Sequence, residues 1–287
     1  MTADSAGTAP LEPLKAHQAP RLLEADKTTV NYLDLTFPTP AENLACDEAL
    51  LDWCDEGDGL EVLRFWEPQQ HFVVVGYSNR VEREVNVKAC RELCIPVLRR
   101  CSGGGAVLQG PGCLNYALVL HMDSDPTLQT VTGTNQFVME RNRAALENLL
   151  SRSSERKEGL SPNFQLSTFN FQLSVRGHTD LVISDRKFSG NAQRRKRRAV
   201  LFHGSFLFNF DLALIEQVLS LPSNQPDYRQ NRSHDEFLMN LDVSAKEVKV
   251  ILRQTWRASE DLKGFRAGQT QTLAAQKYST NAWNMKF

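Results

Sequence analysis

The chain has 287 residues, 41% of them hydrophobic, which is enough apolar material for a sizeable core in one large domain or two small ones. Its 33 Lys and Arg residues nearly balance its 34 Asp and Glu residues, so the net charge excludes a whole-molecule attraction to nucleic acid or to a membrane. No apolar stretch approaches the roughly 18 to 20 residues that span a bilayer, and the amino terminus lacks the pattern of a signal peptide. We therefore expect a soluble, cytoplasmic protein that acts through a local site.

The amino-terminal part of the chain changes character near residue 30. Residues 1–28 are rich in Ala, Pro, Thr and Lys without apolar periodicity, so we predict a disordered tail. The following residues 30–35 alternate as a strand does, and residues 41–54 have the spacing of an amphipathic helix. Two runs rich in β-branched and aromatic residues come next, at 60–66 and 71–76, and we expect them to pair as a hairpin.

Three consecutive glycines stand between two strand-like runs, in the stretch Arg99-Arg100-Cys101-Ser102-Gly103-Gly104-Gly105-Ala106-Val107-Leu108. Glycine costs backbone entropy on folding, so such a run marks a sharp bend or a place where a ligand lies against the main chain. The stretch matches neither a phosphate loop nor a dinucleotide-binding turn. With two arginines at its upstream edge it predicts a cradle for an anion, and a plain tight turn is the alternative.

The remaining segments predict further helices and strands. Residues 180–183 and 187–192 predict a second hairpin around a turn at 184–186, and residues 199–210 predict a buried strand pair. The five-residue echo of Asn163-Phe164-Gln165-Leu166-Ser167 in Asn170-Phe171-Gln172-Leu173-Ser174 predicts an extended surface loop. Helical patterns occur at 86–93, 134–150, 211–219, 244–256 and 268–278, and a further strand pattern occurs at 114–120.

Two charged features have more than one interpretation. The five cations at 194–198 are typical of a solvated loop, although local positive charge could also attract an acidic partner or a polyphosphate. His203 lies in a predicted buried strand, where a hydrogen-bonded core histidine is the first interpretation and a catalytic histidine the second.

The six cysteines show neither C-x-x-C spacing nor a nearby histidine pair, which argues against a zinc site and a disulfide framework. We therefore predict no protein metal site, and most of the cysteines are expected to be reduced, buried fillers. Cys101 and Cys113 flank the glycine bend, so a reactive role for either one is left open.

Several segments, in this order, resemble the catalytic domain of the lipoate-protein ligase and octanoyltransferase family. They are Asn43-Leu44-Ala45-Cys46-Asp47-Glu48-Ala49-Leu50, the glycine stretch, Leu114-Asn115-Tyr116, Asp180-Leu181-Val182, Lys187-Phe188-Ser189-Gly190-Asn191-Ala192-Gln193 and His203-Gly204-Ser205. The resemblance runs from about residue 30 to the end. It implies an α+β fold, with mixed β-sheets flanked by helices as in biotin/lipoate-protein ligase catalytic domains. Because no Pro/Gly/Ser-rich linker occurs between residues 30 and 287, we expect a single domain over 29–287, with no accessory C-terminal domain of the kind that many ligases carry.

The resemblance further implies a set of functional residues. Lys187 matches the active-site lysine of the family, and a fixed ammonium there would stabilise negative charge at a phosphate or carbonyl oxygen. The residues implied to bind the nucleotide and the acyl-adenylate are Arg100, Gly103, Gly104, Gly105, Ala106, Val107, Leu108, Asp180 and His203.

The implied activity is that of a lipoate-protein ligase. Such an enzyme uses ATP, with Mg²⁺, to convert lipoate to lipoyl-AMP and then transfers the acyl group to a lysine of a lipoyl-carrier domain. The expected acceptors are 2-oxoacid dehydrogenases or the H protein of glycine cleavage, and a separate accessory subunit is a further expected partner. One departure is residues 109–113, where a ligase more often has Asp-x-Gly-Asn.

Two alternatives remain within the resemblance. The first is an octanoyl or lipoyl transferase that needs no ATP and takes the acyl group from acyl carrier protein or from a lipoylated protein. Several branches of this kind use a cysteine thioester, but residues 161–179 contain no cysteine and none follows Cys113. The second, lesser alternative is a non-catalytic member that binds lipoyl domains.

Overall fold

The computed structural model describes residues 29–57, 60–158 and 173–287. The predicted tail over 1–28 and nearly all of the repeated segment at 163–174 lie outside these residues. Within the described ranges no helix is both long enough and apolar enough to cross a bilayer.

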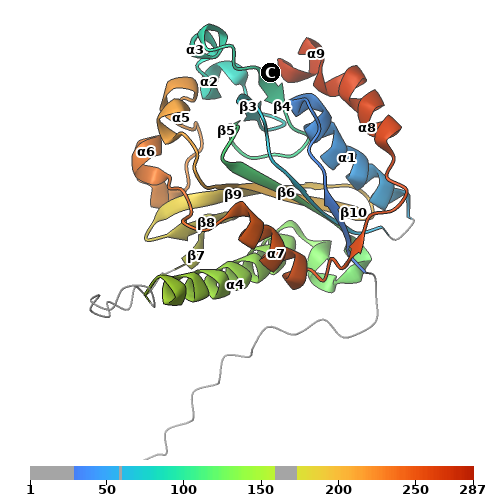
Figure 1. Ribbon diagram of the computed structural model, residues 1–287. Helices are drawn as coiled ribbons and strands as arrows, with labels where there is room; N and C mark the ends of the chain where they lie inside the picture. Colours follow the sequence, from blue (N-terminus) through green and yellow to red (C-terminus); the bar gives the residue numbers. More distant parts are fainter. Residues whose placement is uncertain (1–28, 58–59, 159–172) are drawn as a thin grey trace, which may run out of the picture.

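A mixed sheet of eight strands forms the centre of the molecule, in the order β11-β1-β2-β6-β10-β9-β8-β7 (Figure 1). Strands β6 and β10 pair antiparallel over nine residues each at its middle. The strands are β1 (Asn31–Asp34), β2 (Val62–Trp66), β6 (Cys113–His121), β7 (Leu173–Arg176), β8 (Asp180–Ile183), β9 (Arg186–Arg195), β10 (Ala199–Leu207) and β11 (Glu260–Asp261).

A second sheet of three strands lies beside the first, in the order β4 (Val97–Arg99), β3 (Phe72–Val75) and β5 (Val107–Gln109). The predicted hairpin between 60–66 and 71–76 is therefore wrong, because the two runs belong to different sheets. Both edges of β2 are already occupied, by β1 and by β6, so β3 has no free edge on β2 to join. It instead becomes the centre of the small sheet, where all its residues are buried.

Of the predictions for the hairpin at 180–192, the strand pair at 199–210 and the glycine bend, the first and the last are confirmed. The hairpin of β8 and β9 is confirmed, and its turn residues Ser184 and Asp185 both have positive φ. The predicted strand pair over 199–210 is wrong, because nothing interrupts β10 from Ala199 to Leu207. The glycine bend joins β4 to β5, as the β-rich surroundings predicted.

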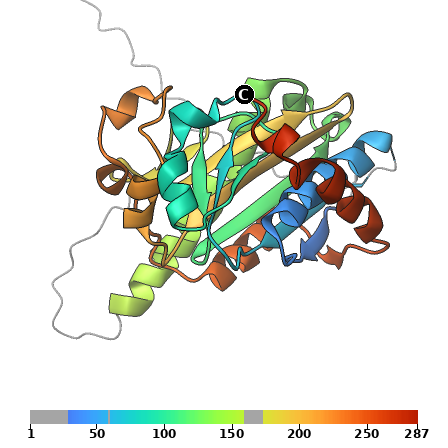
Figure 2. The same cartoon turned by 90° about the horizontal axis from the view of Figure 1, so that it is seen from above.

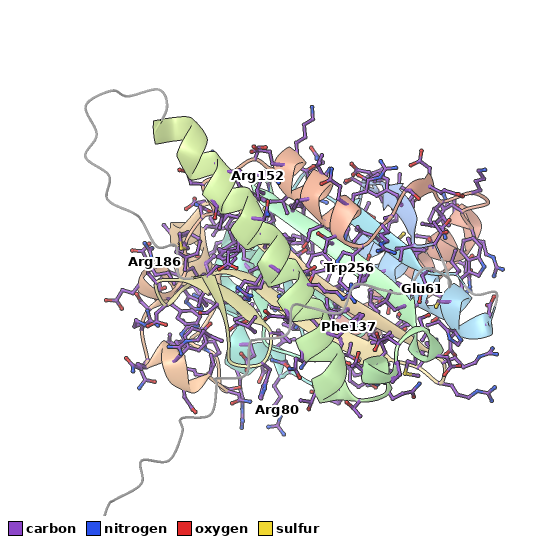
Figure 3. All side chains as sticks on the ribbon, turned by 90° about the horizontal axis from the view of Figure 1, so that it is seen from below. Glu61, Arg80, Phe137, Arg152, Arg186 and Trp256 are labelled. Carbon is purple, nitrogen blue, oxygen red and sulfur yellow. The ribbon has the colours of Figure 1, made fainter. Side chains whose placement is uncertain are left out.

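Helices cover both faces of the large sheet (Figures 1 and 2). One face carries α4 (Val131–Glu158) and α7 (Ala245–Thr255), and Figure 3 shows α4 running across the sheet. Phe137 of α4 packs on Trp256 with ring centroids 5.9 Å apart. The opposite face carries α1 (Pro40–Glu56) and α8 (Ala267–Leu273). The remaining α-helices are short: α2 (Val81–Glu84), α3 (Val87–Glu92), α5 (Leu212–Val218), α6 (His234–Phe237) and α9 (Asn281–Asn284).

Local capping explains why these helices begin where they do. Thr39 and Glu42 form a reciprocal capping box at the start of α1, which ends at Gly57 in the left-handed conformation. Ser244 and Glu247 form the same box at α7. The helices predicted at 41–54, 86–93, 134–150, 211–219, 244–256 and 268–278 are confirmed, the last as α8 followed by a π-helical turn over Ala274–Tyr278.

Three of the five cations at 194–198 make hydrogen bonds or ion pairs with other elements, unlike the residues of a solvated loop. Arg195 belongs to the end of β9 and donates to the carbonyl oxygen of Leu128 at 2.6 Å. Arg198 donates to the carbonyl oxygen of Asp55 at 2.6 Å, and Lys196 pairs with Asp52. These three cations therefore tie β9 and β10 to neighbouring helices.

Candidate active site

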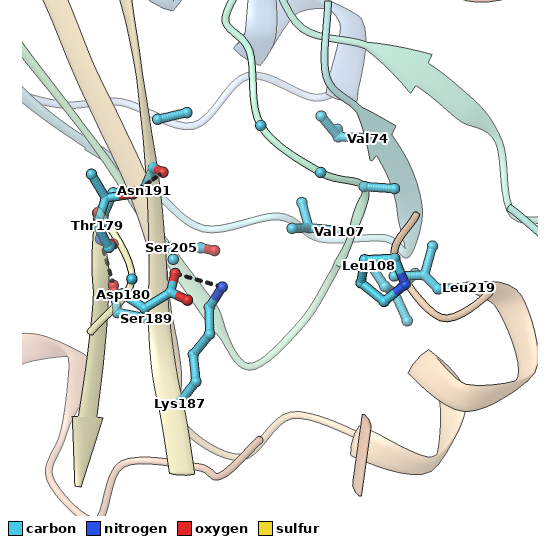
Figure 4. Close-up of a pocket in the computed structure, with 18 of the residues that line it drawn as sticks. Val74, Val107, Leu108, Thr179, Asp180, Lys187, Ser189, Asn191, Ser205 and Leu219 are labelled. Carbon is cyan, nitrogen blue, oxygen red and sulfur yellow. Dashed lines mark hydrogen bonds and ion pairs between the residues drawn. The ribbon is translucent and has the colours of Figure 1, made fainter. Parts of the chain in front are cut away.

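A cavity of about 1090 Å³ lies between the large and the small sheet (Figure 4). Figure 4 shows Val107 and Leu108 of the small sheet on one side, and Lys187 and Asp180 of the large sheet on the other. Of the ten residues predicted for the site, the nine that line this cavity are Arg100, Gly104, Gly105, Ala106, Val107, Leu108, Asp180, Lys187 and His203. Gly103 belongs to the same bend but is not among the lining residues.

The glycine bend is held by its carbonyl groups. Arg100 donates from Nη2 to the carbonyl oxygens of Gly103 at 2.6 Å and Gly105 at 2.8 Å, and Tyr77 donates its N–H to the carbonyl oxygen of Ser102 at 2.8 Å. Burial lowers the pKa of Arg100 to about 10, so its guanidinium is still charged at neutral pH. The arginine is thus an internal brace of the bend.

The N–H groups of the bend have a different environment from its carbonyls. Gly103, Gly104 and Gly105 are exposed, and within the described ranges their N–H groups have no hydrogen-bond acceptor. Successive free N–H groups on a turn whose carbonyls point inward form a concave site for an anion. This geometry supports the cradle that the glycines and arginines predicted.

Two glycines make this packing feasible. A Cβ on Gly76, at the end of β3, would lie 2.0 Å from the carbonyl oxygen of Gly104, so only glycine allows the bend to rest there. Gly104 itself has φ of +89°, a backbone conformation that other residues rarely adopt.

The strand that leads into the bend is clamped by the last residues of the chain. Asn284 accepts the N–H of Arg99 at 3.0 Å, and Trp283 donates from Nε1 to the carbonyl oxygen of Arg99 at 2.8 Å. The Arg99 guanidinium lies over the ring of Phe287 at 5.3 Å. This clamp, formed by Trp283, Asn284 and Phe287, fixes β4 and with it the start of the bend.

Lys187 faces the bend from β9 as part of a charged group. Its Nζ lies 2.7 Å from Oδ1 of Asp180, and Tyr228 donates to Oδ2 of the same carboxylate at 2.8 Å. Gly190 leaves room for this arrangement, since a Cβ there would lie 2.7 Å from the Lys187 Nζ. Burial, and then the Asp180 charge, raise the pKa of Tyr228, so its hydroxyl remains a donor.

Asn191 lies on the same wall and is oriented by a buried chain of polar groups. Trp256 donates to Asn142 at 2.9 Å, Asn142 to the Tyr116 hydroxyl at 3.0 Å, and Tyr116 to Oδ1 of Asn191 at 2.7 Å. Thr179 exchanges two hydrogen bonds with Asn191, each 2.7 Å long. The core under the large sheet therefore fixes a polar group of the cavity.

His203 is hydrogen-bonded at both ring nitrogens, and it lines the cavity instead of lying in the core that the first interpretation predicted. Its Nε2 lies 2.6 Å from the hydroxyl of Ser102, and its Nδ1 lies 3.3 Å from Oδ2 of Asp47. The other oxygen of Asp47 pairs with Arg64 at 2.5 Å. Sequence analysis gave no role to Asp47, Ser102 or Tyr228. The two partners of His203 lie 101 and 156 positions away, so no local pattern connects them.

None of the six cysteines lines the cavity, and all six lie in the described part of the chain. Five are buried, and Cys94 is exposed. Burial raises the pKa of Cys101 and of Cys113 to about 12, so both thiols stay protonated and weakly nucleophilic at neutral pH. Burial therefore argues against a reactive role for Cys101 or Cys113.

Alkylation of the native protein at neutral pH checks this directly. We expect iodoacetamide to modify Cys94 and to leave Cys101 and Cys113 unmodified, because the two buried thiols are both inaccessible and protonated. Peptide mapping by mass spectrometry gives the sites, and the denatured protein, in which all six cysteines should react, is the control. Rapid labelling of Cys101 in the native state would contradict the burial argument.

No group of three or more His, Cys, Asp or Glu side chains suited to a metal ion occurs among the described residues.

Comparison with known proteins places these features in a family context. A sequence model described as "Lipoyl protein ligase A/B catalytic domain" matches residues 39–254. Octanoyltransferase LipM of Lysinibacillus sphaericus is 26% identical over 279 residues, which cover 90% of this chain and 99% of that protein. The LipM of Bacillus subtilis is 25% identical, with 91% and 99% covered.

Solved structures of ligases have the same fold. The bipartite lipoate protein ligase of Thermoplasma acidophilum, studied with its E2 lipoyl domain, superposes with a TM-score of 0.69 at 25% identity, covering 90% of this chain and 97% of that one. A lipoate-protein ligase A bound with ATP gives a TM-score of 0.68 at 27% identity, with 90% and 99% covered. The predicted α+β fold with mixed sheets and flanking helices is confirmed.

Proposed function

The chain belongs to the lipoyl protein ligase A/B catalytic-domain family, and on that premise we propose that it transfers an octanoyl or lipoyl group to a lysine of a lipoyl-carrier domain. One observation carries the proposal. The unpaired N–H groups of the glycine bend and the Lys187–Asp180 pair face each other across a single cavity. An acyl group held between them has the N–H dipoles of the bend on one side and the Lys187 ammonium on the other.

This arrangement suits attack by an amine on an activated acyl carbon. As the acceptor lysine adds, the carbonyl oxygen gains negative charge, and the Lys187 ammonium can stabilise it. When the tetrahedral species collapses, the bond from the acyl carbon to the donor's leaving group breaks and the proton from the amine nitrogen passes to that leaving group, so that an amide and the protonated leaving group remain. Asp180 and Tyr228 hold the Lys187 ammonium in place throughout.

For the donor we propose an octanoyl thioester of acyl carrier protein. Support comes from relatives named octanoyltransferase, which align over 99% of their length. Because no cysteine lines the cavity, the acceptor lysine would attack the donor thioester directly, without an enzyme-bound thioester. The proposed acceptors are the lipoyl domains of 2-oxoacid dehydrogenases and the glycine cleavage H protein.

A second candidate is the ATP-dependent ligase, and one observation favours it. The N–H groups of the glycine bend suit the phosphate of an acyl-adenylate. In that case ATP and lipoate bind in the cavity. Mg²⁺ would be held mainly through phosphate oxygens. A separate accessory chain would then be a further partner.

Mass detection of an acceptor lipoyl domain separates the candidates. The protein is incubated with the domain and octanoyl-acyl carrier protein in one arm, and with lipoate or octanoate plus ATP and Mg²⁺ in the other. Acylation only with the carrier protein supports the transferase, and acylation only with ATP supports the ligase. Acylation in neither arm overturns the proposal and leaves the non-catalytic binding alternative.

A further inference from the structure

A continuous hydrogen-bonded chain runs beneath the glycine bend, from α1 to the bend itself. It starts at Asp47, passes through the ring of His203 to the Ser102 hydroxyl, and continues to Arg100, whose Nε donates to that hydroxyl at 3.1 Å. Arg100 then braces the carbonyl oxygens of Gly103 and Gly105. The chain thus ends on the glycine bend, of which Gly104 and Gly105 line the cavity.

The hydrogen count of this chain allows one consistent arrangement. The Asp47 carboxylate only accepts, so the His203 proton lies on Nδ1. Nε2 then accepts from the Ser102 hydroxyl, whose oxygen in turn accepts from Arg100. This tautomer is assigned from the bonding partners, and it leaves each donor with an acceptor.

Burial distinguishes this chain from a nucleophilic triad. Ser102 is 0% exposed and does not line the cavity, and its hydroxyl is enclosed between His203 and Arg100. A nucleophilic serine must reach the acyl carbon, whereas this one reaches only protein atoms. The hydrogen bond between Ser102 and His203 therefore has a structural role in the site and not a nucleophilic one.

We propose that His203 and Asp47 are positioning residues, which act through Ser102 and Arg100 to hold the glycine bend in the shape that presents its N–H groups to the acyl donor. The inference rests on the proposed function. Asp47 is itself fixed by Arg64, which is fully buried and also donates to the side chain of Asn43 at 2.8 Å. The rigid interface of α1 with β2 is thereby coupled to a loop that touches substrate.

Kinetics of four variants test the proposal. Ser102→Ala breaks the chain with the smallest change in volume, and His203→Asn removes the contact with Ser102 while keeping a group near Asp47. His203→Gln instead places an amide near the Nε2 position. Ser124→Ala is the matched control. It removes a hydroxyl that donates to Glu61 at 2.6 Å, and Ser124 does not line the cavity.

We expect Ser102→Ala and His203→Asn to raise the KM for the donor about tenfold or more, with the KM for the lipoyl domain nearly unchanged. His203→Gln should recover part of the loss, and Ser124→Ala should behave as wild type. Unchanged donor KM in Ser102→Ala, or equal loss of kcat in both His203 variants with unchanged donor KM, would overturn the positioning role.

Hydrogen exchange provides a readout that does not depend on activity. In the unliganded protein, peptides covering residues 100–108 should exchange faster in Ser102→Ala than in wild type, while peptides from α4 exchange equally. If wild type acylates no lipoyl domain, the proposed function fails, yet the exchange comparison still decides whether the chain holds the bend. Equal exchange of residues 100–108 in both proteins refutes the inference.

Discussion

Replacing Lys187 by alanine is expected to lower the rate of acyl transfer by about 100-fold or more, because the change removes the cation that faces the developing charge in a partly dry cavity. The lysine side chain is only 23% exposed and has a single carboxylate partner, Asp180, within the described ranges. Its loss leaves Asp180 with the Tyr228 hydroxyl, so the carboxylate keeps one donor and the fold should survive.

The measurement is the initial rate of acceptor acylation, followed by mass, with thermal unfolding as the check on folding. Lys187→Arg keeps the charge in a different shape and should retain more activity than alanine. Lys196→Ala is a matched control on the same strand region, since Lys196 pairs with Asp52 and does not line the cavity. Activity of Lys187→Ala within about threefold of wild type would show that Lys187 is not the active-site cation.

Replacing Gly76 by alanine is expected to abolish most of the activity by displacing the glycine bend. The new Cβ would lie 2.0 Å from the carbonyl oxygen of Gly104, a backbone atom that cannot move without moving the bend. We expect a loss of about 100-fold in rate if the N–H groups shift by an ångström or so. Overpacking at such a site also costs about 1–3 kcal/mol in the free energy of unfolding.

Gly268→Ala in α8 is the internal control for this prediction. A Cβ on Gly268 meets nothing within 4 Å, and Gly268 does not line the cavity. The control variant should keep the stability of wild type and most of its activity. Activity and urea unfolding are measured for both variants, and a fully active Gly76→Ala protein would mean that the shape of the bend is unimportant for transfer.

The glycine bend could be predicted from the sequence because local chemistry marks it, whereas Lys187 was predicted from the resemblance of its segment to the family. Three glycines between two strand-like runs indicate a tight turn or a place where a ligand lies against the main chain. The signals for helix starts are also local, since the two residues of a capping box, such as Thr39 and Glu42, lie within one turn of each other. These features depend on neighbours in the chain, so the sequence contains the whole signal.

The pairing of strands and the supports of the site depend on distant residues. Nothing in residues 60–66 or 71–76 states that β1 and β6 occupy both edges of β2, and the hairpin prediction was wrong for that reason. Likewise, Tyr228 reaches Asp180 from 48 positions away. Cys101 was a candidate by its position in the sequence, but its burial is set by the packing of the whole domain.

The clamp on β4 has a consequence for biosynthesis. Arg99 is bonded to residues about 184 positions further along the chain, so the strand that begins the anion cradle lacks its final supports until Trp283 and Asn284 have been made. Most of the core that packs on α4 is complete earlier in the sequence. A nascent chain can therefore pack this core before β4 gains the supports that Trp283 and Asn284 provide.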